Sequence, residues 1–146
     1  MSRLRSRRST ITFITMGTSD HAVIARIIQD AGGFGHREHV ELAWSYLQMY
    51  DTDRAAEAMV AAIRHLAEVH GAQGKFHETI TRGWLHCVAV HDQRWGAADF
   101  DTFLQRNPDL LDRTLLGHFY SRELIGSEDA RASFREPDLR ALPVLA

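Results

Sequence analysis

The sequence lacks the features that mark several large classes of protein. Its 146 residues include one cysteine, so no disulfide can form within the chain, and a free thiol favours a reducing cytoplasm. No apolar run approaches the roughly 18 residues that a membrane-spanning helix needs. The apolar stretch near the N-terminus is too short for a secretory signal and has no small-residue cleavage site. We therefore expect a cytoplasmic protein that does not cross a membrane.

Charge of one sign is also not in large excess. The formal net charge is −2, so no overall positive field would attract nucleic acid. Lys75 is the only lysine among the 17 basic residues, a bias that indicates a GC-rich genome more than a mechanism. A phosphate-binding loop, a dinucleotide fingerprint and a serine nucleophile elbow are all missing. Nucleic-acid binding and the common nucleotide and hydrolase chemistries are therefore not expected.

Helical periodicity is the main signal in the sequence. Hydrophobic residues make up 45% of the chain and recur at helical spacing, and no strand pattern or repeat is seen beyond the N-terminal arm. The residues predict an all-α, single-domain, compact bundle over residues 18–146, preceded by an arginine-rich N-terminal arm at 1–17. Short C-terminal helices should follow four main helices, at about 18–31, 36–50, 53–70 and 75–93.

Histidine is abundant, at nine residues, and two histidine motifs stand at predicted helix starts. His36 and His39 begin one helix, and His77 begins the helix expected at 75–93. His36 precedes Val40 by one turn, on the stripe predicted to be buried, and His39 shares that general face. If the two helices lie side by side, the three imidazoles can converge.

Convergent imidazoles suit a borderline transition metal such as zinc, copper or iron. The leading hypothesis is therefore a small metal-dependent enzyme, an oxidoreductase acting on a small organic molecule. Its metal ligands would be His36, His39 and His77. Glu78 would be a further ligand or a base, and Thr81 and Tyr120 would line the pocket. The spacing is not that of the HExxH zinc signature, so the pattern alone does not identify a metal site.

A structural role for the same histidines explains the pattern about as well. They would then cap helices or hydrogen-bond in the core, to Thr79, Thr81, Tyr46 or the backbone. The protein would be a non-catalytic ligand-binding module or a homodimeric interaction module, and a pH-responsive switch is a third possibility. Cys87 is expected to be a small core residue, and three tryptophans are expected to be core anchors, namely Trp44, Trp84 and Trp95.

Three stretches carry a resemblance to a widespread group of small bacterial helical proteins: FGHREHVELAWSYL at 34–47, GAQGKFHETITRGW at 71–84 and NPDLLD at 107–112. Members of that group typically have FxHxxHxxxAW and YHETxT motifs. The resemblance spans about residues 34–134 and implies no particular reaction. It does imply that the histidine motifs belong together, namely His36, His39 and His77-Glu78. Phe76 departs from the group, in which tyrosine is common at this position.

Overall fold

The computed structural model describes residues 18–146, and the predicted N-terminal arm, residues 1–17, lies outside the described residues. The described chain is helical and contains no strand, which confirms the predicted all-α bundle. Its four long helices are α2 (Thr18–Ala31), α3 (His36–Met49), α4 (Thr52–Val69) and α5 (Glu78–Trp95). The shorter elements are η1 (Gln73–Lys75), α6 (Phe100–Arg106), η2 (Pro108–Leu111), η3 (Leu115–His118), α7 (Arg122–Ile125) and α8 (Glu128–Ala132).

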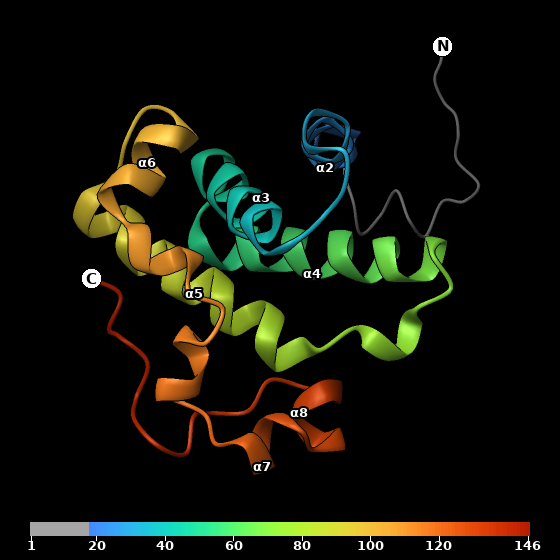
Figure 1. Ribbon diagram of the computed structural model, residues 1–146, viewed down its shortest axis with the longest axis vertical. Helices are drawn as coiled ribbons and strands as arrows, with labels where there is room; N and C mark the ends of the chain where they lie inside the picture. The colour runs from blue at the N-terminus through green and yellow to red at the C-terminus, as the bar shows by residue number, and fades with distance from the viewer. Residues whose placement is uncertain (1–17) are drawn as a thin grey trace.

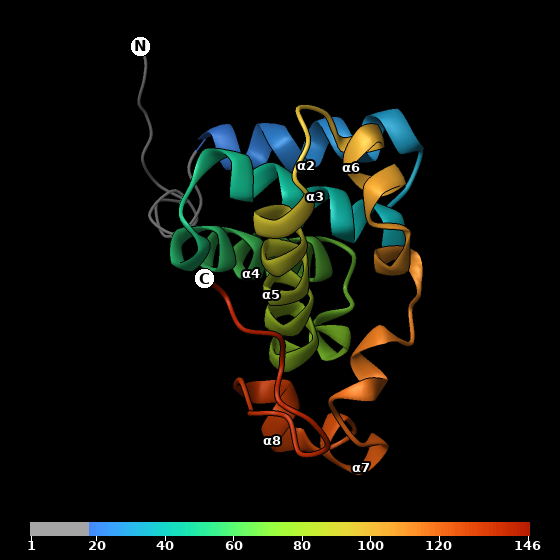
Figure 2. The same ribbon diagram turned by 90° about the vertical axis from the view of Figure 1, so that its left-hand side faces the viewer.

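Three of the long helices form the centre of the molecule. α3, α4 and α5 all pack against one another, and α2 packs on α3. α2 and α6 lie at one end of the molecule, whereas α7 and α8 lie at the opposite end, beyond the start of α5 (Figures 1 and 2). The end of the chain runs back along α5, where the Pro143 carbonyl meets His86 and the Ala146 N–H meets Gln93.

Local chemistry explains most helix boundaries. Asp51 caps α4 by accepting a hydrogen bond from the Arg54 N–H at 2.8 Å. Gly32 follows α2 with a φ of 76°, and Gly71 follows α4 with a φ of 64°, a left-handed conformation that favours glycine. The predicted start of α5 was three residues too early, because a short 3-10 turn occupies the region of Lys75 and the helix begins at Glu78.

The core confirms one prediction about single side chains and corrects another. Cys87 is 1% exposed, and burial raises the pKa of its thiol to about 12, as expected for a core residue. Trp84 is also buried, but Trp95 is 52% exposed and is not a core anchor. Trp95 is the last residue of α5. Within residues 18–146, no helix is long and apolar enough to cross a membrane.

Candidate functional site

His36 begins α3 and joins that helix to η2. Its Nε2 lies 2.9 Å from the Leu110 carbonyl oxygen, and its ring contacts Trp84 edge to face, with ring centroids 4.5 Å apart. A carbonyl oxygen can only accept, so Nε2 carries the proton and donates it. No described residue hydrogen-bonds to Nδ1 of His36, which carries a lone pair where the ring is neutral.

His39 lies one turn further along α3 and has the opposite tautomer. Its Nδ1 donates to the Gly35 carbonyl at 3.2 Å, and its ring packs against Phe34 with centroids 4.6 Å apart. Nε2 of His39 therefore keeps its lone pair, again without a described partner. Burial is the main cause that lowers the pKa of His39, so this imidazole is neutral at pH 7.

Both histidines line an open pocket of about 280 Å³ between α3 and α5, here called the imidazole pocket. Arg113 also lines it, from the turn after η2, and its exposed guanidinium makes no hydrogen bond or ion pair with a described residue. None of the described lining residues carries a carboxylate, a hydroxyl or a thiol. The complete described lining is Gly35, His36, His39, Ile80, Trp84 and Arg113.

His77 is not part of the imidazole pocket, although the histidine pattern predicted that it would join His36 and His39. It caps α5, where its Nδ1 accepts from the Ile80 N–H at 3.1 Å. Its Nε2 donates to the Ile125 carbonyl at 2.7 Å, and only 8% of the residue is exposed. Both ring nitrogens are thus used by the fold, and the neutral ring is held as a single tautomer.

The three predicted metal ligands are therefore not brought together. His36 contacts Trp84, which lies about two turns, or about 10 Å, beyond His77 along α5. Imidazoles that share a metal have nitrogens about 2.0–2.1 Å from the ion, so the three rings would have to meet at one point. Among the residues that the structure describes, no group of three or more His, Cys, Asp or Glu could hold a metal ion. The arrangement gives the metal prediction no support.

Glu78, predicted as a ligand or base, is a buried ion-pair partner. Its Oε1 accepts from Arg64 at 3.0 Å and its Oε2 accepts from Arg82 at 2.6 Å. Arg82 also forms an ion pair with Glu57, at 3.1 Å. Both oxygens of Glu78 thus hold guanidinium groups, and the residue links α5 to α4.

Thr81 and Tyr120, predicted to line a pocket with the histidines, also make internal hydrogen bonds. Thr81 Oγ1 donates to the His77 carbonyl one turn back, at 2.8 Å. The Tyr120 hydroxyl donates to the Arg135 carbonyl at 2.7 Å, and burial raises its pKa to about 12. Neither residue lines the imidazole pocket.

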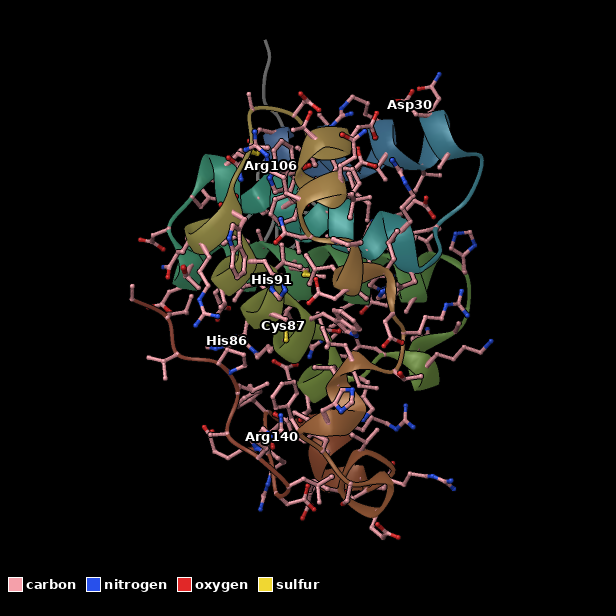
Figure 3. The ribbon with its side chains drawn as sticks, turned by 60° about the vertical axis from the view of Figure 1, so that its left-hand side comes forward. Asp30, His86, Cys87, His91, Arg106 and Arg140 are labelled. Atoms are coloured by element: carbon pink, nitrogen blue, oxygen red, sulfur yellow. The ribbon has the colours of Figure 1, made fainter. Side chains whose placement is uncertain are left out.

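Histidines of the bundle instead share a structural task that sequence analysis left among the alternatives. Each of three imidazoles donates its Nε2 proton to a backbone carbonyl in the chain after α6, and we call these residues the histidine anchors. Figure 3 places one of them, His86, on α5 next to Cys87, and Arg140 on the C-terminal segment. The anchors and their acceptors are His36 with Leu110, His77 with Ile125 and His86 with Pro143.

The start of α5 carries further contacts of the same kind. Thr79 is fully buried, and its Oγ1 donates to the Ser133 carbonyl and accepts from the Arg135 N–H, both at 3.0 Å. Together with His77, Thr79 fixes the irregular C-terminal segment to the long helices. The HETIT stretch of the histidine motif therefore serves as a docking point for this segment.

Arg113 and Ile80 were missed as site residues. Ile80 has the spacing of an ordinary core position, and Arg113 stands in a turn whose path depends on packing. The only sequence signal for Arg113 was its place directly after the NPDLLD stretch.

Comparisons of the chain with models of protein families, with curated proteins and with solved structures find no match. The resemblance to small bacterial helical proteins stays a prediction.

Proposed function

We propose that the protein is a non-catalytic helical module that binds a small molecule in the imidazole pocket. One observation carries the proposal. Hydrogen bonds to carbonyls orient His36 and His39, and each ring keeps one nitrogen without a described partner, beside the unpaired guanidinium of Arg113. Polar groups that are oriented in this way, next to the apolar Ile80 and Trp84, are typical of a ligand site.

Binding is favoured over catalysis by what the other candidate residues do. Both carboxylate oxygens of Glu78 hold arginines, and the hydroxyls of Thr81 and Tyr120 donate to backbone carbonyls. The described lining of the pocket offers no nucleophile apart from the imidazoles. Glu78, the base predicted from the sequence, does not line the pocket, so His36 and His39 are the only described lining side chains that could accept a proton there.

A metal-dependent oxidoreductase, the leading hypothesis from the sequence, ranks second. It would require His77 to lose both of its hydrogen bonds, and α5 to shift by about two turns relative to α3. Metal analysis of protein purified without a histidine tag separates the two functions. We expect less than stoichiometric zinc, copper and iron, and one equivalent of any of them would favour the enzyme. A homodimeric module is the other non-catalytic possibility, and it stays a prediction.

The indole N–H groups of two tryptophans test the proposal in one experiment. Trp84 lines the pocket, whereas Trp95 lies about 16 Å further along α5 and serves as an internal control. A fragment collection of acidic, neutral and basic compounds is titrated against ¹⁵N-labelled protein. We expect some fragments to shift the Trp84 indole signal to saturation and to leave the Trp95 signal in place. The proposal is wrong if no fragment of any charge shifts Trp84 selectively at millimolar concentration.

A further inference from the structure

We infer that the ligand of the imidazole pocket is a small carboxylic acid, which carries a hydroxyl or amino group and an apolar body. This inference rests on the proposed function and adds the chemical class of the ligand. Three properties of the lining support it, namely the charge of Arg113, the tautomers of the two imidazoles, and the apolar surface of Ile80 and Trp84.

The first property is an unbalanced positive charge. Arg113 is exposed and pairs with no described acid. Two acids stand close by in sequence, but each is already used in its own turn. Glu38 Oε1 accepts from the Gly35 N–H at 2.7 Å, and Asp112 Oδ1 accepts from the backbone and hydroxyl of Thr114 at 2.9 and 2.7 Å. The guanidinium is therefore available to a carboxylate, whose two oxygens match its planar fork of donors.

The second property is a pair of hydrogen-bond acceptors. His36 donates through Nε2 and His39 through Nδ1, so the opposite nitrogen of each ring has no described partner and, where the ring is neutral, carries a lone pair. A lowered pKa at His39 keeps that ring neutral at pH 7. The unprotonated nitrogen of a neutral imidazole accepts a hydrogen bond from an O–H or N–H group and does not bind a second carboxylate. The ligand should therefore offer at least one donor next to its carboxylate.

The third property is the size and polarity of the remaining space. Ile80 and Trp84 supply apolar lining, and the pocket volume is about 280 Å³. Pockets for drug-sized molecules span about 300–1,000 Å³, so the part of the ligand that this open pocket covers is at the small end of that range. A single ring or a branched aliphatic group meets this limit.

Mandelate has a carboxylate, a hydroxyl and an aromatic ring, one for each property of the lining, and is the probe for the test. Mandelamide keeps the ring and hydroxyl but has no charge, and phenylacetate keeps the ring and charge but has no hydroxyl. Binding is measured from the Trp84 indole signal of the intact protein at pH 7. We expect mandelamide to bind at least about tenfold more weakly than mandelate, because a charged hydrogen-bond pair is lost. Phenylacetate should bind about three- to tenfold more weakly, because one neutral hydrogen bond is lost.

Two charge variants complete the design. Arg113→Gln should weaken mandelate binding by about tenfold and leave mandelamide binding unchanged. Arg140→Gln is the matched control: it removes the same charge from an exposed residue outside the pocket lining, so mandelate should bind as it does to the native protein. Both residues are exposed, so neither change should unfold the protein.

The outcomes separate this inference from the proposed function. If mandelate and mandelamide bind equally, or if Arg113→Gln and Arg140→Gln behave alike, the carboxylate inference is wrong while the pocket still binds ligands. If no acidic probe shifts the Trp84 signal but neutral or basic fragments do, the carboxylate inference is again wrong and the pocket still binds ligands. If no fragment of any charge shifts Trp84, both proposals fail.

Discussion

Replacing His77 by alanine should destabilise the protein because both ring nitrogens serve the fold. The change removes the cap of α5 and leaves the Ile80 N–H without its acceptor, which costs about 1 kcal/mol. It also leaves the Ile125 carbonyl without the donor that lies 2.7 Å away, which costs about 1–3 kcal/mol where that group stays buried. The expected loss in the free energy of unfolding is thus about 2–4 kcal/mol.

Urea unfolding followed by circular dichroism measures this loss, and two further variants show its origin. His77→Asn keeps an acceptor at the cap but is too short for Ile125, so we expect it to recover about 1 kcal/mol. His70→Ala is the control: His70 is exposed, its side chain bonds to no described residue, and the change should stay within about 0.5 kcal/mol. The reasoning is refuted if His77→Ala is as stable as His70→Ala.

Three other experiments test separate parts of the structure. Gly83→Ala should raise the free energy of unfolding by up to about 1 kcal/mol, measured by urea unfolding, because alanine favours the helix. The added Cβ would meet Leu116 at 3.4 Å, an ordinary contact, so a clear loss of stability would contradict the packing. Cys87 should react with a thiol reagent at pH 8 only as fast as the protein unfolds, since burial raises its pKa to about 12, and rapid labelling of the folded protein would refute its burial. Glu78→Gln should lower the free energy of unfolding by about 1–2 kcal/mol because Arg82 loses a charged partner. If the variant is as stable as the native protein in both high and low salt, the ion pair contributes nothing.

The long helices were predictable from sequence because their signals are local. Apolar spacing and caps such as Asp51 depend on neighbouring residues, and the predicted ends agree with the structure within about one or two residues for α2, α3 and α4. The start of α5 was misplaced because Lys75 and Phe76 are compatible with a helix, while the ring of His77 forms the cap. A histidine in this role has no strong sequence signature, since the usual capping residues are serine, threonine, aspartate and asparagine.

The candidate site was predictable only in part. His36 and His39 share a helix face, and periodicity alone placed them together. Whether His77 joins them depends on the offset between α5 and α3 along their axes. In the structure Trp84, and not His77, lies opposite His36. Packing sets that offset, and the hydrophobic pattern of each helix is the same for either offset.

The acceptors of the histidine anchors were not predictable at all. Every residue has a backbone carbonyl, so the sequence cannot mark Leu110, Ile125 or Pro143 as partners. The abundance of histidine was a real signal, but its interpretation needed the path of the C-terminal segment.

The tautomers of the histidine rings test most directly whether these nitrogens serve the fold and the pocket instead of a metal. Long-range ¹H–¹⁵N correlation spectra at about pH 8, above the ordinary imidazole pKa of about 6.5, distinguish a protonated Nε2 from a protonated Nδ1. We predict the Nε2–H form for His36 and His77 and the Nδ1–H form for His39, with the His77 signals unchanged when one equivalent of zinc is added. A proton on Nδ1 of His77, or a shift of both the His36 and His77 rings with zinc, would contradict this assignment.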